Sequence, residues 1–540
     1  MYAQKIEDVE KFAGEHKKIV CYGASDHGHM VKHYLEMKGY IVEEFWITDP
    51  IEIGTIRDGV PVHSVGDIEK ITLECGVVLS LYERHHEEVI KSLIKKGADE
   101  SSICAIPDLM QHEMHRKVLL KRRIDILSTK INLSLEEEKK YIFFAERLFN
   151  EYKNIKMMFF SAWRLGHYAL WIAKIAERCR KNDDKSYYLF YPVAQEHYPD
   201  KELICANGYL LTLLHGKGLE MLSRSNIKFW QYMYQRYHEK FVFNDIYDYM
   251  AWSNEDLEHY DEIQNNEGVL SFSADEEIRG GMLLESLGIE DQYVCISNRD
   301  PAFLQTEKRD IVKPDFRDIY RNSDIETRSM AIDYLREQGI QSVRMGARVQ
   351  SKWNYPNLID STNDKRTEFA DVYLNSKAKF FIGDLTGIMT FAMLCAKPVL
   401  ILNAPVFTTR YDAMLFLMPD RDIAIIKKLY DKRHGRYLTI REMLDYEVNK
   451  AVQEKNGPGA VFWYYYEHDI VPVDNSKEEI LEATIEMNER IEKKYNYDSL
   501  DDELQIRYRE IVDSFDLNGA VLNKWRLGAK FLRDNQWLLQ

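Results

Sequence analysis

The chain has 540 residues with 45% hydrophobic and 30% charged side chains, a composition that indicates a globular protein of about three domains. Its formal net charge of −16 disfavours general nucleic-acid binding and an anionic membrane surface, because both need a basic face. The seven scattered cysteines lack the spacing of zinc centres, so we expect buried reduced thiols. Neither a basic-then-apolar leader nor an apolar run of about 18 residues is present, which predicts a soluble, cytoplasmic protein without a transmembrane segment.

Residues 1–110 alternate between apolar strands and helices, a pattern that predicts a Rossmann-like accessory domain. The first strand leads into a glycine-containing turn, but serine replaces the middle glycine of the dinucleotide-binding pattern G-x-G-x-x-G. An aspartate after the second strand is placed to meet a ribose. Two roles stay open for this domain, accessory nucleotide binding and a scaffold or partner-docking role. The residues that would serve the first role are Gly23, Ser25, Gly28 and Asp49.

Three histidines, His27, His29 and His33, lie at the start of the first predicted helix after that turn and suggest a metal ion. No matching carboxylate pattern accompanies them, so we expect solvated or helix-capping side chains and no metal site. The glycine–histidine turn and the later DGVPV run (58–62) resemble the N-terminal domain of bacterial sugar O-acyltransferases, which implies that the domain binds a nucleotide sugar. The catalytic repeat that should follow in that family is absent from this sequence.

Residues 111–153 are charged and helical in pattern, which predicts a helical connector with exposed faces. This connector is also a candidate for self-association into a homo-oligomer. A second strand–turn–helix unit begins after it, and its first strand runs into SAWRLGH (161–167). There Gly166 allows a ligand to approach the backbone closely, with Arg164 and His167 on either side. We expect His167 to act as a general base or to contact the acceptor.

Three strands of a third unit end in functional residues. YVCISNR (293–299) ends in Arg299, IQSVRMG (340–346) carries Arg344 and Gly346, and FFIG (380–383) is followed by Asp384, Leu385, Thr386 and Gly387. Because the carboxyl ends of parallel strands share one edge of a sheet, we expect these residues to converge. Thr386 and Gly387 would lie in the first turn of the next helix and bind phosphate, or else Asp384 or Thr386 only caps that helix. Two arginines and a helix end predict a diphosphate site.

Residues 150–540 resemble a bacterial glycosyltransferase family found with surface-polysaccharide genes. The resemblance rests on SAWRLGH, YVCISNRD, the run 320–346, FFIGDLTGI with KPVLILN, and AKFLRDNQWLL (529–539). It implies an α/β fold of three Rossmann-like units, the last two forming a GT-B-type pair of domains that face a cleft. The acceptor-side domain would be 154–288, the donor-binding domain 289–475, and residues 476–540 a helical segment packing back on the core.

Glycosyl transfer requires neutralisation of the charge that develops on the leaving nucleotide. We expect arginines to do this without a metal or a cofactor, so the catalytic candidates are His167, Arg299 and Arg344. Arg321 and Asn322 of the matching motif either contact the donor or hold their loop, and Lys352 lies in a long loop that is expected to face the cleft. The full set of substrate-binding candidates is Arg164, Gly166, Arg321, Asn322, Gly346, Lys352, Asp384, Leu385, Thr386 and Gly387.

The expected partners are a nucleotide-sugar donor and a glycan, lipid-linked or protein acceptor. The alternative is a non-catalytic nucleotide-sugar-binding or assembly protein, which would bind a donor without releasing free nucleotide. An oxidoreductase is disfavoured because the glycine loop of residues 1–110 is incomplete and no convincing Tyr/Lys or His dyad accompanies it.

Overall fold

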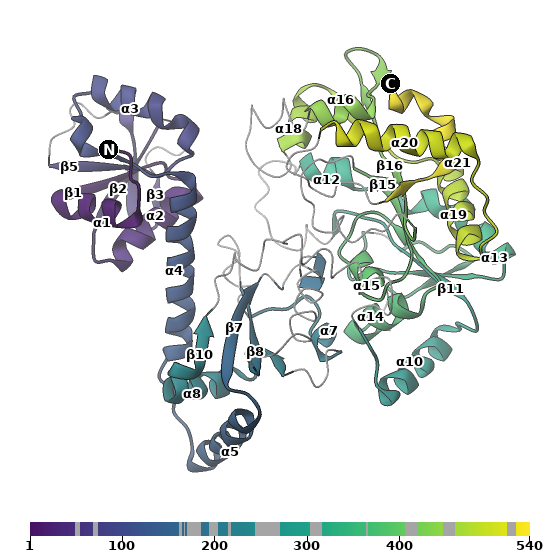
Figure 1. Ribbon diagram of the computed structural model, residues 1–540, viewed down its shortest axis with the longest axis horizontal. Coiled ribbons are helices and arrows are strands. Elements are labelled where there is room, and N and C mark those ends of the chain that lie inside the picture. Colours follow the sequence, from purple (N-terminus) through teal and green to yellow (C-terminus); the bar gives the residue numbers. More distant parts are fainter. Residues whose placement is uncertain are drawn as a thin grey trace. The chain divides into compact units, whose positions relative to one another are not determined.

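The computed structural model describes residues 1–48, 55–67, 74–160, 162, 165–166, 168–169, 185–193, 203–213, 218–243, 270–302, 316–350, 352–362, 366–405, 420–446, 460–515 and 525–540. The chain divides into two compact units, residues 1–148 with 225–241 and residues 149–224 with 242–540. The described residues form three sheets of mainly parallel strands and one small antiparallel sheet, with helices packed on them (Figure 1). The predicted α/β class with three parallel-stranded units is therefore confirmed.

The first unit contains a six-stranded sheet in the order β3-β4-β2-β1-β5-β6, parallel except for the β3–β4 pair. Its central strands are apolar runs buried on both faces, because α1, α2 and α4 pack on one face and α3 on the other. The strands are β1 (Lys18–Tyr22), β2 (Val42–Ile47), β3 (Ile56–Arg57), β4 (Val60–Ser64), β5 (Cys75–Leu79) and β6 (Ile103–Ala105). The helices are α1 (Ile6–Glu15), α2 (Asp26–Met37), α3 (His86–Lys95) and α4 (Asp108–Ser128), with 3-10 turns at Val65–Asp67, Glu83–His85 and Glu100–Ser102.

The predicted connector consists of α4 and α5 (Leu135–Glu151). Helix α4 leads from the first sheet to α8 (Ile227–Tyr237), which is followed by a 3-10 turn at His238–Lys240 (Figure 1). The amide of Gln231 donates a hydrogen bond to the carbonyl of Ile126 at 2.9 Å. Residues 225–241, which the sequence analysis placed within 154–288, thus group with the first unit.

The second unit contains two parallel sheets. Strands β7 (Asn154–Phe160), β8 (Ser186–Pro192) and β9 (Leu219–Met221) are parallel and lie in the order β10-β7-β8-β9 with β10 (Phe241–Phe243). The larger sheet has seven parallel strands in the order β13-β12-β11-β14-β15-β16-β20. These are β11 (Tyr293–Ile296), β12 (Gln341–Arg344), β13 (Leu358–Asp360), β14 (Phe381–Gly383), β15 (Val399–Ala404), β16 (Ile423–Ile426) and β20 (Arg526–Leu527). A small antiparallel sheet comprises β17 (Lys428–Asp431), β18 (Arg436–Tyr437) and β19 (Ile470–Val473).

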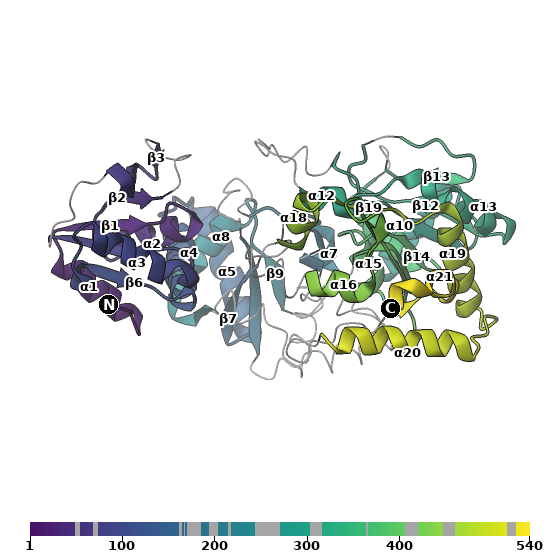
Figure 2. The ribbon, with the colours of Figure 1, turned by 90° about the horizontal axis from the view of Figure 1, so that it is seen from above.

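The helices of the second unit cover the seven-stranded sheet. They are α7 (Tyr209–Thr212), α10 (Ala274–Leu287), α12 (Phe316–Arg321), α13 (Ser329–Glu337), α14 (Glu368–Lys377), α15 (Met389–Leu394), α16 (Ile440–Asp445), α18 (Ala460–Glu467), α19 (Lys477–Ile491), α20 (Ser499–Asp513) and α21 (Ala529–Asp534), with 3-10 turns at Ile325–Arg328 and Gln536–Leu539. Helix α19 packs on α13 and α21, and α20 contacts α16 and α21 (Figure 2). The helices of residues 476–540 share one buried hydrophobic cluster with the sheet.

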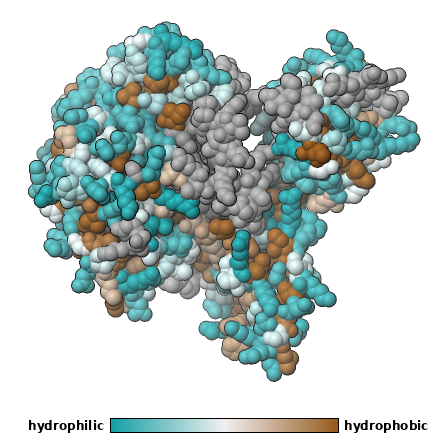
Figure 3. All heavy atoms as spheres, turned by 180° about the vertical axis from the view of Figure 1, so that it is seen from behind, coloured by the Kyte–Doolittle hydropathy of each residue, from teal (hydrophilic) through white to brown (hydrophobic). Residues whose placement is uncertain are grey.

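On the face shown in Figure 3, the described residues are mostly hydrophilic, and hydrophobic side chains gather there in several patches. Among the helices of the described residues, none combines the length and the apolar character that crossing a bilayer demands.

Two glycines of the first unit are required by packing. A Cβ placed on Gly28 would lie 1.8 Å from the carbonyl oxygen of Gly23, and Gly23 itself has a φ of +114°. We therefore predict that Gly28→Ala destabilises the first unit by about 3 kcal/mol or more, because the clash is with rigid backbone. Gly14→Ala is the matched control, since its Cβ would meet only ordinary contacts at 3.7 Å. Urea unfolding would measure both, and equal midpoints for the two variants would contradict this packing.

Glu486 on α19 is buried at 1% exposure beneath the C-terminal segment. Burial raises the pKa of this carboxyl to about 7, although hydrogen bonds from the Ala529 N–H at 2.7 Å and the Tyr497 hydroxyl at 2.9 Å oppose the rise. The unfolded chain binds a proton at Glu486 only below its ordinary pKa of 4.5. The contribution of Glu486 to the free energy of unfolding is therefore fully present below pH 4.5 and falls as the pH rises toward 7. Above pH 7 the free energy of unfolding is lower by about 3 kcal/mol than it is below pH 4.5 on account of this group.

We predict that Glu486→Gln removes this part of the pH dependence, so that the variant is more stable than the wild type at pH 8 and similar to it at pH 4.5. Urea unfolding at the two pH values measures the effect. Glu482→Gln, on the same helix with a partly exposed side chain, is the control. Parallel pH profiles for the wild type and Glu486→Gln would show that the buried carboxyl is not the source.

A candidate ligand site at the switch point of the seven-stranded sheet

The strand order of the seven-stranded sheet reverses between β11 and β14, because later strands are added on both sides of this pair. The loops that follow two such strands diverge and leave room for a ligand at the carboxyl edge of the sheet. Arg299 follows β11 and Asp384 follows β14, and the Arg299 N–H donates to Asp384 Oδ2 at 2.8 Å. The prediction that these strand ends converge is confirmed.

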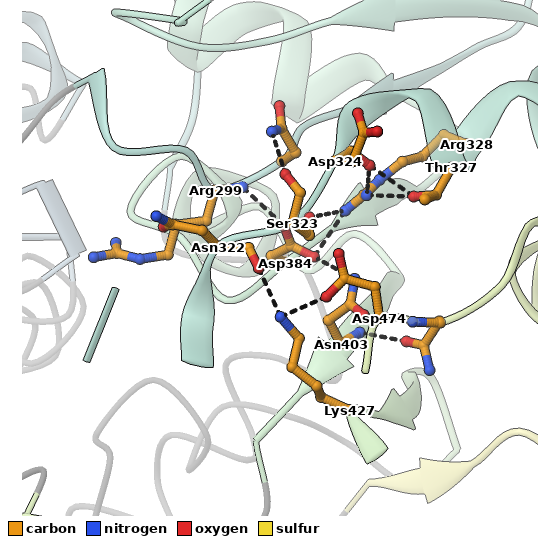
Figure 4. Close-up of polar contacts among 12 residues, drawn as sticks. Arg299, Asn322, Ser323, Asp324, Thr327, Arg328, Asp384, Asn403, Lys427 and Asp474 are labelled. Atoms are coloured by element: carbon orange, nitrogen blue, oxygen red, sulfur yellow. Dashed lines mark hydrogen bonds and ion pairs between the residues drawn. The ribbon is translucent and has the colours of Figure 1, made fainter. Parts of the chain in front are cut away.

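Asp384 is the centre of a buried polar network rather than an exposed ligand contact (Figure 4). Its Oδ1 accepts from Arg328 Nη2 at 2.7 Å and from Asn403 Nδ2 at 3.1 Å. Its Oδ2 accepts from the Arg299 N–H and from the Ser323 hydroxyl. Four donors occupy the lone-pair sites of the carboxylate, so Asp384 holds the loops that surround the site.

Arg328, which the sequence analysis did not select, is fully buried and neutralises Asp384. Its second guanidinium nitrogen, Nη1, donates to the Asp324 carbonyl and, at 2.7 Å, to the Thr327 hydroxyl. The guanidinium therefore fixes the loop between α12 and α13 to the end of β14 (Figure 4). A sequence signal existed, because the motif that contains Arg321 and Asn322 also contains Arg328.

The ends of β15 and β16 join the same network. Asn403, buried and with a φ of +50°, exchanges two hydrogen bonds with Asn475, which precedes α19. Lys427, buried after β16, donates to the Asn322 carbonyl at 2.6 Å and pairs with Asp474 at 2.8 Å (Figure 4). Four neighbouring strand ends are thus held in one rigid edge, which is the kind of support a ligand site needs.

The two predicted arginines differ in exposure. The Arg299 side chain is partly exposed, and its guanidinium points away from the Asp384 network (Figure 4). Arg344, at the end of β12, is only 1% exposed. Burial lowers the pKa of Arg344, while Asp360 and Asp300 act in the opposite direction. Truncation of Arg344 would leave a cavity and two poorly compensated carboxylates, so Arg344 is a less clean probe of ligand binding than Arg299.

The turn after β14 differs from the prediction. Helix α15 begins at Met389, so Thr386 and Gly387 precede its first turn, and neither Asp384 nor Thr386 caps it. The side chain of Leu385 is buried. The backbone of Gly387 instead meets the turn after β7, since a Cβ on Gly387 would lie 2.9 Å from the Gly166 nitrogen. The glycines of two predicted turns, one from each parallel sheet of the second unit, therefore lie against each other.

Two predicted side chains carry buried oxygens without a hydrogen-bond partner among the described residues. These are Thr386 Oγ1, after β14, and Asn322 Oδ1, between α12 and the 3-10 turn. Buried polar atoms in native folds are almost always paired, so such atoms mark places where a ligand or a water molecule completes the bonding. Both residues lie in the two loops that Asp384 holds together.

The remaining second-unit candidates line the loops nearby or fall outside the described residues. Arg321 ends α12, and Gly346 follows β12 with a φ of +154° that L side chains rarely adopt. Lys352 is exposed. Two residues before it, the Gln350 N–H donates a hydrogen bond to the Asp300 carboxylate at 2.9 Å. Arg164 and His167 lie outside the described residues, so their positions remain predictions.

In the first unit, the glycine-containing turn after β1 packs directly against the start of α2. Gly28 is explained by the clash that a Cβ would make with Gly23, and Gly23 by its positive φ and the nearby Ser80 carbonyl, so neither glycine needs a nucleotide to account for it. Ser25 precedes α2 without a side-chain cap. Asp49 lies outside the described residues. The scaffold role and the nucleotide-binding role of this unit both stay predictions.

One D-x-D sequence, Asp420-Arg421-Asp422, occurs in the chain. The Asp422 carboxylate accepts from the Val399 N–H at 2.9 Å, at the amino ends of β15 and β16. This is the edge of the sheet opposite to Asp384, so the pair of aspartates does not form a metal clamp at the switch point.

No protein-family model and no curated protein sequence matches this chain. Among solved structures, it is similar to a family 9 glycosyltransferase from Veillonella parvula DSM 2008, with 11% identity over 63% of this chain and 98% of that one, at a TM-score of 0.32. It is also similar to the heptosyltransferase WaaC of E. coli with ADP-2-deoxy-2-fluoro heptose, with 10% identity over 81% of this chain and 99% of that one, at a TM-score of 0.19.

The dodecameric glycosyltransferase TibC of enterotoxigenic E. coli H10407 shares 13% identity over 46% of this chain and 58% of that one, at a TM-score of 0.24. These three TM-scores are below 0.5.

Proposed function

We propose that the second unit binds a nucleoside-diphosphate sugar at the switch point of the seven-stranded sheet and transfers the sugar to a hydroxyl of a glycan, lipid-linked or protein acceptor. The observation that carries this proposal is the pair of unpaired buried oxygens, Thr386 Oγ1 and Asn322 Oδ1, in two loops that Asp384 joins to the loop carrying Arg299. A hydroxyl, an amide and a guanidinium suit a diphosphate with an attached sugar, which offers anionic oxygens to donors and hydroxyl groups to acceptors.

Each group has a distinct part in the proposed reaction. The Arg299 guanidinium bonds the diphosphate and stabilises the charge that grows on the leaving nucleotide. The Thr386 hydroxyl donates to a phosphate oxygen, and Asn322 Oδ1 accepts from a ribose or sugar hydroxyl. Arg344 adds positive charge from beneath the site. No metal ion is required, because the arginines take over the neutralisation of the leaving group.

The contact of Gly166 with Gly387 supports a GT-B-type arrangement in which the β7–β9 sheet carries the acceptor side. In this arrangement Arg164 and His167 follow β7 and act on the acceptor, with His167 as the base for an inverting transfer. The two facing domains in this proposal are residues 154–224 with 242–288 and residues 289–475, because residues 225–241 group with the first unit. The first unit is a scaffold or an accessory nucleotide-binding domain.

A thermal-shift screen of the full chain against nucleoside diphosphates and their common sugar conjugates tests the binding step. A ligand at 100 times its Kd adds about 2.7 kcal/mol of stability, so a true donor is expected to raise the midpoint visibly. Thr386→Val should weaken this donor about 10- to 150-fold, since a hydrogen bond to a charged group is lost. Thr212→Val, exposed on α7, is the matched control. If Thr386→Val and the wild type bind the donor with equal affinity, the donor does not bind at Thr386.

Release of free nucleotide in the presence of acceptor extracts tests the transfer step. The proposed glycosyltransferase is expected to release nucleotide only with both substrates present. A chain that binds the same donor tightly and releases none with any acceptor class would instead be the non-catalytic nucleotide-sugar-binding or assembly protein.

A further inference from the structure

Two histidines of the first unit lie one above the other on α2. His29 and His33 are four residues apart, which places them on the same face of the helix one turn apart. Their rings meet edge to face, with centroids 4.4 Å apart and an interplanar angle of 83°. His27 is not part of this pair, because its ring packs on Tyr82 and His112 instead.

A carboxylate reaches this pair from the β3–β4 hairpin. Arg57 pairs with Val60, which leaves Asp58 and Gly59 as a two-residue turn. Both have positive φ values, +49° and +78°, as hairpins with an Asp-Gly turn require. The turn directs the Asp58 carboxylate at α2, where its Oδ2 contacts His29 Nδ1 and lies 3.9 Å from His33 Nε2. The expectation of solvated or helix-capping side chains is therefore wrong for His29, which pairs with Asp58.

The three donor atoms are close enough to share one ion. They lie within 4.8 Å of one another, and the side chains are 22%, 26% and 20% exposed, so the cluster is sheltered without being sealed. Zinc–nitrogen and zinc–oxygen bonds of about 2.0–2.2 Å place neighbouring ligands about 3–3.5 Å apart. To reach that geometry, His33 must move toward Asp58, and His29 and Asp58 must move apart to admit the ion.

A second carboxylate orients one of the rings. Glu36 Oε2 lies 3.5 Å from His33 Nδ1, and its other oxygen accepts from Lys32 Nζ at 2.7 Å. A carboxylate at Nδ1 favours a proton on that nitrogen and leaves the Nε2 lone pair directed at Asp58. Metal-bound histidines usually have such an outer carboxylate.

We propose that His29 Nδ1, His33 Nε2 and Asp58 Oδ2 bind a divalent transition-metal ion of the zinc class, with water at the fourth position. Two imidazoles and one carboxylate suit Zn²⁺, whereas Ca²⁺ and Mg²⁺ prefer sites made of oxygen ligands. The ion joins α2 to the turn of the β3–β4 hairpin, which lies at the amino end of β4, so it stabilises the packing of this hairpin on the helix. The metal belongs to the first unit, and the proposed transfer is assigned to residues of the second unit alone.

The test is a titration of the EDTA-treated full chain with Zn²⁺, followed by calorimetry, and with Co²⁺, whose visible absorption reports a four-coordinate site. The wild type is expected to bind one equivalent and to melt at a higher temperature with Zn²⁺. Asp58→Asn keeps the turn, since asparagine accepts a positive φ, and removes the charged ligand. It is expected to weaken binding by more than the ~10–100-fold typical of an outer-shell change such as Glu36→Gln.

His63→Gln is the control, because His63 is on β4 of the same unit and pairs with Glu44 at 3.2 Å outside the cluster. It should bind Zn²⁺ like the wild type. Equal affinity of Asp58→Asn and the wild type would overturn the proposal, as would the absence of stoichiometric binding by the wild type. In the latter case the cluster is a His–Asp ion pair only. Melting curves without metal show whether each variant is folded.

Discussion

Replacement of Asp384 by alanine is expected to lower the free energy of unfolding of the second unit by about 3–5 kcal/mol, because Arg328 would remain buried without its counter-ion. The same change removes acceptors from the Arg299 N–H and Asn403, which adds to the loss. Urea unfolding measures it. The control is Asp534→Ala. Asp534 pairs with Lys530, and both side chains are about half exposed, so this change should lower the free energy of unfolding by less than about 1 kcal/mol.

A double-mutant cycle separates the ion pair from the rest of the network. Arg328→Met and Asp384→Ala should each be strongly destabilising, and the double variant should lose far less than the sum of the two. Some loss should persist in the double variant, because Ser323 and Asn403 also donate to Asp384. Additive effects would mean that the two residues do not act as a pair.

Arg299→Ala is expected to reduce sugar transfer about 10²–10³-fold, since one preorganised donor to the leaving group is removed. The fold should be kept, because the bond that Arg299 makes to Asp384 comes from its backbone N–H and survives the change. Turnover of the nucleotide sugar, with the melting temperature measured in parallel, checks both statements.

Arg299→Lys and Arg336→Ala complete this experiment. Lysine retains the charge but not the planar fork, so an intermediate rate is expected. Arg336 lies on α13 and bonds Asn357 at 2.6 Å, remote from the network, so Arg336→Ala should turn over like the wild type. Wild-type turnover by Arg299→Ala would remove Arg299 from the mechanism and leave the proposed site without its leaving-group stabiliser.

The strands and their shared edge could be predicted because they depend on local pattern. The apolar runs before Arg299, Arg344 and Asp384 are short and end in polar residues, and parallel strands must place those ends together. The prediction was less successful for the turn after β14, where sequence pattern alone does not fix where α15 begins. Helix ends depend on the backbone bonds that the tertiary structure leaves available, and here Gly387 packs on another turn instead.

The polar network could not be predicted because its members are distant in sequence. The sequence does not indicate the role of Arg328, because arginine is rarely buried and only its pairing with Asp384 makes burial tolerable. The two hydrogen bonds between Asn403 and Asn475 join residues that are far apart in sequence, and no repeating sequence pattern relates the two positions. Asp58 reaches His29 through a hairpin turn, so the carboxylate is absent from the helix pattern in which a metal motif would be sought.

The position of β20 has a consequence for synthesis of the chain. This strand pairs with β16 at the edge of the seven-stranded sheet, yet the ribosome makes it only after α16, α18, α19 and α20. Until then β16 presents an open edge, the kind of surface on which chains associate wrongly. The pairing is non-local, and contacts between residues distant in sequence form slowly. While the second unit is being synthesised, the open edge of β16 must therefore be kept from pairing with other chains until residues 526–527 are available.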